Sequence, residues 1–356
     1  MRVLIAGGGT GGHVIPALAI ARELKARYGA EVLFVGTARG IENRLVPQAG
    51  YRLELVKVGA LKNVGLATRL RTLSDLPLAI LRARKIMRAF RPDVVVGVGG
   101  YASGPAMAAA ILGGVPTLAF EPNYVPGFAN KIVGRRVSAA AVHFEETKRF
   151  FRNARVVGVP VRTEFFATPV PAEGRPPALL VFGGSQGAHA INAAVTAAMP
   201  ELLRQVPGLH VIHQTGEGDY NEVQAAYTRA GASAEVSAFI DNMPQAFARA
   251  DLLVCRSGAS TVAEIAAAGK PAVFIPFPRA ADDHQRRNAE AIANAGAAVL
   301  MDESALTPEL LAKTLAGMFR DPMHLRVMGE KARSLAHRDA AGQVAEMVER
   351  LLASSC

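Results

Sequence analysis

The chain has 356 residues, half of them hydrophobic, which is enough apolar material for two domains with separate cores. Trp is absent and aromatic residues are sparse, a composition that favours close-packed α/β architecture over an aromatic-rich β-sandwich. The net charge of +10 is uneven, because residues 1–160 hold 23 basic and 9 acidic residues whereas the remainder holds 17 and 21. This imbalance predicts that the first half meets a polyanion, either nucleic acid or an anionic membrane; a solvated basic surface is the alternative.

The two cysteines, Cys255 and Cys356, are far apart in the chain, which argues against a disulfide framework and for a reducing cytoplasm. No charged-then-apolar leader precedes the first predicted strand. No apolar run approaches the roughly 20 residues needed to cross a bilayer. We therefore expect a protein that is soluble or lies on a membrane surface.

In the first half, short apolar runs alternate with helical patterns. Strands are predicted at 3–6, 31–35, 52–56, 93–98 and 116–120, and helices at 15–28 and 106–112. Strands that alternate with helices imply βαβ units, right-handed crossovers and a parallel sheet. Residues 163–177 contain four prolines and little periodicity, which predicts a linker after a first domain of residues 1–162.

The second half repeats this rhythm. Strands are predicted at 178–182, 210–214, 235–239, 252–255 and 272–275, and helices at 189–203, 220–230, 243–250, 260–268, 285–295, 308–319 and 341–352. The order of strand, glycine turn and helix that opens the chain returns at 178–203, which indicates two Rossmann-like domains. We assign the second domain to 178–340 and expect the terminal helix, 341–356, to cross back to the first domain.

A glycine turn, Gly7-Gly8-Gly9-Thr10-Gly11-Gly12-His13, follows the first predicted strand. Glycines let the backbone approach an anion, and a helix start offers unpaired N–H groups, so this arrangement is typical of a phosphate site. His13 adds a titratable group that would face the ligand. A tight strand-to-helix turn with a histidine at the start of the helix is the alternative interpretation.

Two further glycine turns, at 99–104 and 183–187, also follow predicted strands. Ligands of open α/β sheets bind outside the carboxyl ends of strands, so the three turns would converge on one cleft if the two domains face each other. Ser185 and Gln186 can donate to a phosphate or a sugar hydroxyl. Alternatively, Ser185 caps the following helix.

The segment 256–261, which is Arg256 followed by small and hydroxyl residues, opens another predicted helix and suits a diphosphate. Glu264 lies one helical turn beyond Ser260, where its carboxylate can accept hydrogen bonds from the vicinal hydroxyls of a ribose. The alternative is that Ser260 and Thr261 are helix caps and that Glu264 completes a capping box with Thr261.

A polar cluster at 282–288 follows the predicted strand 272–275, and its Gln285 could fix the hydroxyls of a sugar. A solvated loop with a helix cap is the alternative. Two acids beside one histidine also resemble a metal site, but no second His or Cys is near in sequence, so we predict no metal.

The stretch 61–91 holds eight basic residues, one acid (Asp75) and many apolar residues. This mixture suits an anionic membrane surface, along which lysine and arginine stems can lie. An amphipathic helix packed on the sheet would look similar. Nucleic acid is not expected as a partner, because neither a recognition helix nor an aromatic stacking platform is present.

Together these motifs resemble the MurG family of bacterial cell-wall enzymes, which transfer N-acetylglucosamine from UDP-N-acetylglucosamine to undecaprenyl-pyrophosphoryl-N-acetylmuramyl-pentapeptide. The matching residues keep the family's order and cover most of the chain: GGGTGGH (7–13), GGYASGP (99–105), EPN (121–123), GVPVR (158–162), GGSQGA (183–188), FIDNM (239–243), CRSGASTVAEIAAAGKP (255–271) and DHQRRNA (283–289). The sequence departs from the family pattern at Pro122, where the family often has Gln.

The resemblance implies a GT-B fold, an α/β architecture of two Rossmann-like, doubly wound domains that face a central cleft. The first domain would meet the acceptor and the membrane, and the second would bind the UDP-sugar. It implies an inverting, metal-independent transfer without a cofactor, which converts lipid I into lipid II for peptidoglycan. The enzyme would lie peripherally on the cytoplasmic face of the cell membrane, with other cell-wall synthesis proteins as further partners.

Carried over by position, the resemblance gives a set of donor contacts. These are Thr10, Gly11, Gly12, Asn123, Arg162, Ser185, Ile240 and Gln285. Gln186 joins them from its place in the third glycine turn. The segment from Ala259 through Ser260 and Thr261 to Glu264 would hold the diphosphate and ribose, and Ile240 would meet uracil through its backbone. His13 is the leading candidate for the general base on the acceptor hydroxyl.

Two other functions are compatible with the sequence. A UDP-sugar epimerase or another GT-B glycosyltransferase would act without a lipid acceptor. A dinucleotide-dependent oxidoreductase or a nucleotide sensor is more distant, because Val35-Gly36-Thr37 ends the second predicted strand where dinucleotide-binding domains carry an acidic ribose ligand.

Overall fold

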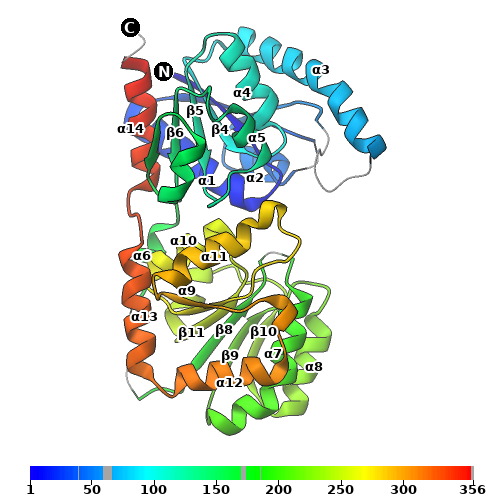
Figure 1. Cartoon of the computed structure of the whole chain (residues 1–356), viewed down its shortest axis with the longest axis vertical. Coiled ribbons are helices and arrows are strands. Elements are labelled where there is room, and N and C mark those ends of the chain that lie inside the picture. Colours follow the sequence, from blue (N-terminus) through cyan, green and yellow to red (C-terminus); the bar gives the residue numbers. More distant parts are fainter. Residues whose placement is uncertain (39, 59–65, 170–173, 185, 354–356) are drawn as a thin grey trace. The chain divides into compact units, whose positions relative to one another are not determined.

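A computed structural model describes residues 1–356 except 39, 59–65, 170–173, 185 and 354–356 (Figure 1). In helix α3 (Leu66–Phe90), side chains are described from Asp75 onward. The chain forms two compact units. Unit 1 comprises Met1–Val161 and Asp339–Cys356, and unit 2 comprises Arg162–Arg338. No helix of the described residues is long and apolar enough to cross a membrane.

Unit 1 is built on a parallel sheet with the strand order β3-β2-β1-β4-β5-β6-β7. Its strands are β1 (Arg2–Gly7), β2 (Glu31–Gly36), β3 (Arg52–Leu55), β4 (Val94–Gly99), β5 (Thr117–Glu121), β6 (Ala139–Val142) and β7 (Ala154–Val156). Every residue of β4 is buried, as expected of a central strand whose two faces are both covered by helices.

The helices of unit 1 lie on both faces of this sheet (Figure 1). They are α1 (Gly11–Tyr28), α2 (Glu42–Gln48), α3, α4 (Ser103–Leu112), α5 (Phe128–Val133), the 3₁₀ turn η1 (Glu145–Phe150) and α14 (Ala340–Ala353). Apolar residues of α3 and α4, such as Met87 and Met107, form one core with Leu4 and Val95 of the sheet. Helix α14 packs beside α1 and against the sheet, where Tyr28 donates to Glu349 at 3.1 Å.

Unit 2 repeats the topology of unit 1 with one edge strand fewer, in the order β10-β9-β8-β11-β12-β13. Its strands are β8 (Ala178–Phe182), β9 (His210–Gln214), β10 (Ser233–Ser237), β11 (Leu252–Cys255), β12 (Ala272–Phe274) and β13 (Ala298–Leu300). In both sheets the strand order reverses beside the first strand, between β1 and β4 and between β8 and β11. Such switch points are where open α/β sheets bind ligands.

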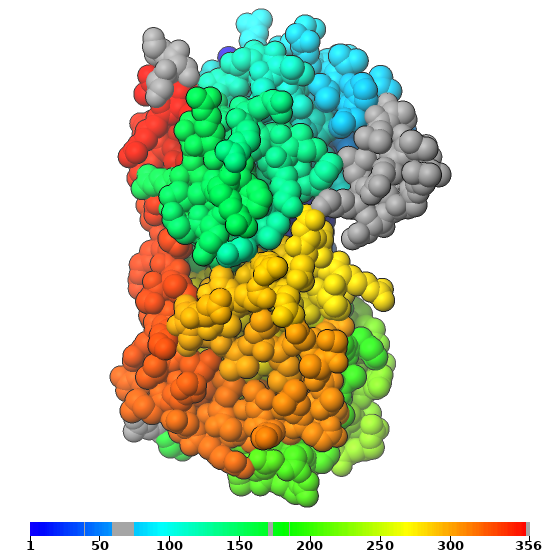
Figure 2. All heavy atoms as spheres, viewed as in Figure 1, coloured from blue at the N-terminus to red at the C-terminus, as the bar shows by residue number. Residues whose placement is uncertain are grey.

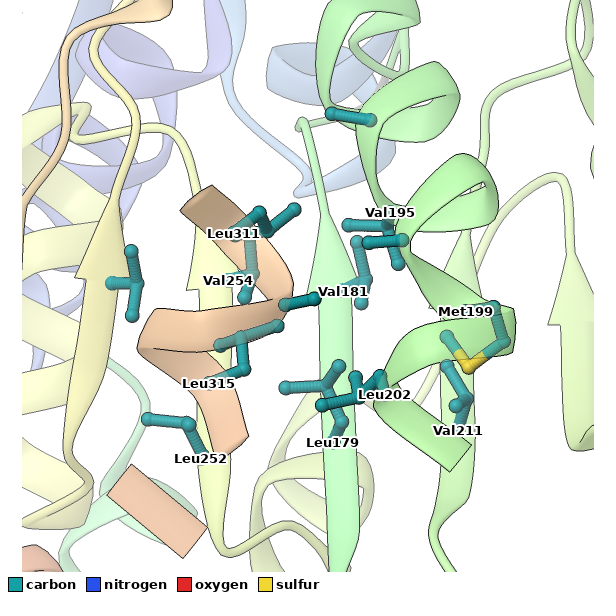
Figure 3. Close-up of a cluster of buried hydrophobic side chains, with 14 of the residues drawn as sticks. Leu179, Val181, Val195, Met199, Leu202, Val211, Leu252, Val254, Leu311 and Leu315 are labelled. Carbon is teal, nitrogen blue, oxygen red and sulfur yellow. The ribbon is translucent and has the colours of Figure 1, made fainter. Parts of the chain in front are cut away.

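The helices and 3₁₀ turns of unit 2 are α6 (Thr163–Phe166), α7 (His189–Gln205), α8 (Tyr220–Ala230), α9 (Met243–Arg249), α10 (Ala259–Ala268), η2 (Ala281–Asp283), α11 (His284–Asn294), η3 (Glu303–Ala305), α12 (Pro308–Phe319) and α13 (Pro322–Ser334). Figure 3 shows side chains of α7 and α12, including Met199 and Leu315, meeting Leu179 of β8 and Val254 of β11 in a buried apolar cluster. This packed layer supports the loops at the carboxyl ends of β8 and β11.

The structure contains elements that the sequence pattern does not predict, among them helices α2, α5 and α13. Strands β6, β7 and β13 were not predicted, because they are short and contain few β-branched residues. Helix α1 begins at Gly11, four residues before the predicted start. Glycine is a weak helix former, so the sequence pattern does not indicate the first turn of this helix. The segment 163–177, predicted as a linker, begins with α6, whose Phe165 is fully buried with its ring centroid 5.0 Å from that of Phe247.

Candidate active site

The two glycine turns of unit 1 pass each other backbone to backbone. The amide of Gly8 donates to the carbonyl oxygen of Gly99 at 3.2 Å. A Cβ atom placed on Gly7 would lie 2.3 Å from that same oxygen, and one placed on Gly100 would lie 2.2 Å from the oxygen of Gly8. Close approach therefore requires glycine at positions 7 and 100, and the first and second glycine turns lie in contact within unit 1. Their convergence with the third turn stays a prediction.

His13 lies at the third position of α1, directly beside this junction. Its backbone amide donates to Thr10, the residue that precedes the helix, at 3.1 Å. A Cβ on Gly99 would come within 2.9 Å of the imidazole Cε1, so the ring rests against the second glycine turn. The side chain is half-buried, whereas Thr10 and Gly12 are exposed. Thr10, Gly12 and His13 thus form one partly open surface at the carboxyl end of β1.

A buried carboxylate, Glu121, ends β5 and orders the loop that carries Asn123. It accepts hydrogen bonds from the backbone amide of Asn123 at 3.0 Å, from its side-chain amide at 3.1 Å, and from Gly127 at 2.9 Å. Burial raises the pKa of Glu121, and these donors oppose the rise. Asn123 is held in place by this carboxylate, a role for Glu121 that the sequence analysis missed although its EPN motif contains the residue.

In unit 2, the loop 183–188 interlocks with the loop after β9 in the same manner. A Cβ on Gly187 would lie 1.8 Å from the oxygen of Thr215, and one on Gly216 would lie 2.4 Å from that of Gln186. Gln186 is exposed, and Ala188 is the N-cap of helix α7. Ser185 itself lies outside the described residues.

Gln214, at the end of β9, joins two predicted binding segments and was missed by the sequence analysis. Its buried side-chain amide donates to the carbonyl oxygen of Gly184 at 2.8 Å and accepts from the backbone amide of Ile240 at 3.1 Å. The amide hydrogen of Ile240 is thus engaged within the protein. A backbone contact between Ile240 and a base would consequently use its carbonyl oxygen.

A buried histidine, His213, helps to hold the loop after β9 that contains Thr215. His213 accepts from the Tyr227 hydroxyl at 2.7 Å, and its other ring nitrogen lies 3.0 Å from the Asn192 side-chain oxygen. Burial lowers the pKa of His213 to about 3, so the imidazole is neutral at physiological pH and its Nε2–H donates to Asn192. Asn192 in turn donates to the oxygen of Thr215 at 2.9 Å, which fixes the loop.

Helix α10 begins directly after β11, at the switch point of unit 2. Gly258 is its N-cap, and Ala259, Ser260 and Thr261 form its first turn. The alternative in which Ser260 and Thr261 cap the helix, with Glu264 in a capping box, is therefore wrong: the helix starts before them, and Glu264 lies in the second turn. The first turn presents backbone N–H groups at the positive end of the helix dipole.

Glu264 projects from α10 in a half-buried position. Desolvation raises the pKa of its carboxyl group to about 7, and the positive charge of Arg162 opposes this rise. Arg162 is exposed, precedes α6 and lies over the ring of Phe165 at 5.1 Å. Unit 2 thus places a carboxyl group of perturbed pKa and a guanidinium near the start of α10, a pairing typical of functional sites.

The segment 282–288 is tied to the start of α10. Ser257 donates from its hydroxyl to the carbonyl oxygen of Gln285 at 2.8 Å, and the side-chain oxygen of Gln285 accepts from the amide of Phe277 at 2.9 Å. Asp282 and Asp283 have positive φ angles of 54° and 55°, which produce the sharp turn before α11. Among the described residues, no group of three or more His, Cys, Asp or Glu side chains could hold a metal ion.

The raised pKa of Glu264 predicts a pH-dependent stability effect. A carboxyl group whose folded pKa is about 7 against an ordinary 4.5 stabilises the fold below pH 4.5, and this contribution is lost as the pH rises through 7. The Glu264→Gln variant removes the titration, so its Tm relative to the wild type should be higher at pH 8 than at pH 5 by about 3 °C or more. Scanning calorimetry at both pH values measures the difference. Glu309→Gln, at an exposed position on α12, is the control, and an equal Tm difference at both pH values for Glu264→Gln would contradict the assignment.

Comparisons with known proteins agree with the two-unit architecture. The model of the glycosyltransferase family 28 N-terminal domain matches residues 3–142, and that of the glycosyltransferase family 28 C-terminal domain matches residues 178–344. The UDP-N-acetylglucosamine-N-acetylmuramyl-(pentapeptide) pyrophosphoryl-undecaprenol N-acetylglucosamine transferase of Myxococcus xanthus is 46% identical, over 99% of this chain and 93% of the relative. The protein of the same name from Geobacter metallireducens is 46% identical over 96% of each chain.

Solved structures confirm the GT-B architecture. The crystal structure of MurG from Acinetobacter baumannii superposes with a TM-score of 0.85 at 34% identity and covers 98% of this chain and 99% of that one. A UDP-GlcNAc 2-epimerase from Neisseria meningitidis superposes with a TM-score of 0.69 at 13% identity, over 98% of this chain and all of that chain, which shows a shared fold alone.

The order of the motifs, the two domain matches and the identity over nearly the full length therefore all indicate the same family. The chain belongs to glycosyltransferase family 28 and, within it, to the MurG family of UDP-N-acetylglucosamine-N-acetylmuramyl-(pentapeptide) pyrophosphoryl-undecaprenol N-acetylglucosamine transferases.

Proposed function

We propose that this protein transfers N-acetylglucosamine from UDP-N-acetylglucosamine to undecaprenyl-pyrophosphoryl-N-acetylmuramyl-pentapeptide, which converts lipid I into lipid II in peptidoglycan synthesis. The observation that carries the proposal is the identity of 43–46% with relatives named for this reaction, over 96–100% of the chain. The epimerase alternative rests on fold likeness at 13% identity or less and is not favoured.

The donor nucleotide is assigned to unit 2. The first turn of α10 from Ala259 to Thr261 would receive the diphosphate, because its N–H groups and helix dipole favour an anion. Glu264 would accept hydrogen bonds from the ribose hydroxyls, and the carbonyl oxygen of Ile240 would accept from the N3–H of uracil. Gln186, Gln285 and Ser185 complete the proposed donor contacts of this unit.

The transfer step is assigned to the junction of glycine turns in unit 1. His13 would take the proton of the acceptor hydroxyl while that oxygen forms a bond to the anomeric carbon. The bond from the anomeric carbon to the UDP oxygen breaks in the same displacement, and the configuration inverts. The negative charge left on UDP would be stabilised by the start of α10 and by Arg162, without a metal. Thr10, Gly11, Gly12 and Asn123 would contact the transferred sugar.

One face of unit 1 suits an anionic membrane. Helices α3, α4 and α5 lie side by side there (Figures 1 and 2), and their contacts agree. We define the α3–α5 face by its exposed apolar residues Leu78, Leu81, Leu112, Phe128 and Ile132 and its exposed basic residues Arg82, Arg84, Lys85, Arg88, Arg135 and Arg136. Of the basic stretch 61–91, residues 61–65 lie outside the described part of the chain.

Large apolar side chains among basic residues fit the boundary between lipid headgroups and acyl chains. Leu78 and Leu81 lie three residues apart on one side of α3 and are 66% and 59% exposed. The alternative in which α3 is an amphipathic helix that only packs on the sheet does not account for these two exposed leucines. We therefore place the protein peripherally on the cytoplasmic face of the cell membrane, where its lipid-linked acceptor is found. Contacts with other cell-wall synthesis proteins stay a prediction.

Transfer to a lipid acceptor tests the proposed function and the role of His13. Labelled UDP-N-acetylglucosamine with lipid I should give labelled lipid II, and His13→Ala should lower kcat by about 10²–10⁴-fold, as loss of a general base does. The dissociation constant for UDP should stay within about twofold, because UDP is assigned to unit 2. His324→Ala, on the exposed surface of α13, is the control.

The two parts of this test fail separately. A wild-type protein that makes no lipid II, or that epimerises or hydrolyses the UDP-sugar without an acceptor, contradicts the proposed function. Product formation at an unchanged rate by His13→Ala contradicts only the assignment of the base.

If the α3–α5 face contacts the membrane, substitutions on this face should weaken vesicle binding and leave UDP binding intact. The double variant Leu78→Glu/Leu81→Glu should bind phosphatidylglycerol vesicles at least tenfold more weakly, since burial of one leucine contributes about 1.5–3 kcal/mol. Cosedimentation measures this, and UDP binding confirms that the variant is folded. Met323→Glu alters a residue of unit 2 that is 65% exposed and should bind like the wild type. Unchanged binding of the double variant, or wild-type binding that is equally strong on neutral vesicles, would contradict the assignment.

A further inference from the structure

A buried carboxylate lies beneath the first glycine turn. Glu42, the first residue of α2, is 1% exposed. Its Oε2 accepts from the amide of Gly9 at 2.7 Å. Its Oε1 accepts from the amide of Thr37 at 2.9 Å and from the Thr37 hydroxyl at 3.1 Å. Both carboxylate oxygens are therefore used to join the turn after β1 to the end of β2.

Three glycines leave the space that this side chain fills. A Cβ on Gly8 would lie 2.3 Å from the Glu42 Cδ, and one on Gly36 would lie 2.6 Å from its Cγ. A Cβ on Gly40 would lie 1.9 Å from Oε2. Gly8 and Gly9 also have φ angles of 151° and 92°, which L-residues rarely adopt. The glycines of the turn thus accommodate a carboxylate of the protein itself.

This arrangement leaves two amides of the turn engaged. Gly9 donates to Glu42 and Gly8 donates to Gly99, so neither amide is directed at a ligand. A carboxylate within hydrogen-bonding distance of the turn would also repel a phosphate placed there. Loop 183–188 of unit 2 differs, because Gln214, a neutral amide, holds its Gly184.

We propose that Glu42 is a positioning residue of the transfer reaction: it fixes the Gly7–Thr10 turn so that Thr10 and His13 meet a neutral, hydroxyl-bearing sugar, and it keeps the donor diphosphate away from this turn. The link to His13 is short, because Gly9 precedes Thr10 and the oxygen of Thr10 accepts from the amides of His13 and Val14, both at 3.1 Å. This inference rests on the proposed function.

The variant Glu42→Gln tests the proposal, because it replaces an acceptor oxygen by an NH₂ group that faces the N–H of Gly9 or Thr37. We expect kcat for lipid II formation to fall at least tenfold, while the dissociation constant for UDP, measured by calorimetry, stays within about twofold. Glu31→Gln, at the exposed start of β2, is the matched control and should behave as the wild type.

A milder variant covers the case in which Glu42→Gln does not fold. Thr37→Val removes only the hydroxyl donor and keeps the backbone bond, so kcat should fall two- to fivefold with UDP binding unchanged. A variant that keeps the wild-type kcat, or that loses UDP affinity in parallel with kcat, overturns the positioning role. A wild type that makes no lipid II overturns the proposed function instead, and the two failures are therefore distinct.

Discussion

Close approach of glycine backbones at the carboxyl ends of parallel strands is the constraint on which both candidate sites depend. In unit 1, Gly7 and Gly100 leave no room for a Cβ between the first and second glycine turns. In unit 2, Gly187 and Gly216 interlock in the same way after β8 and β9. Buried backbone atoms that pass at such distances must be hydrogen-bonded, so each loop has one defined conformation and can present side chains in fixed directions.

The two units use this shared geometry for different chemistry. Beneath the turn of unit 1 lies a carboxylate, Glu42, and beside it lies the imidazole of His13. At the switch point of unit 2, the start of α10 offers a helix N-terminus close to Glu264 and Arg162. The helix N-terminus favours an anion at the second place, whereas the Glu42 carboxylate disfavours one beside the amide of Gly9 at the first. We propose that the duplicated topology serves a nucleotide in unit 2 and a sugar hydroxyl in unit 1.

Much of this could be predicted from the sequence, because long apolar runs and glycine turns have strong local signals. The repeat of strand, turn and helix at residue 178 predicted the second unit, and its sheet order confirms the repeat. The local motifs could not show what holds each loop. Glu42 and Gln214 act across 33 and 30 residues of chain, on Gly9 and Gly184 respectively, and no short-range pattern marks such pairs. Short strands with little sequence signal, such as β13, are likewise defined by their pairing with neighbouring strands.

Amide hydrogen exchange with and without UDP tests whether the nucleotide is bound by unit 2 while the first glycine turn is left for the sugar. We expect slower exchange in peptides covering 239–243 and 256–264 when UDP is added, and unchanged exchange at 7–13. Protection confined to 7–13, with none in the two peptides of unit 2, would contradict it.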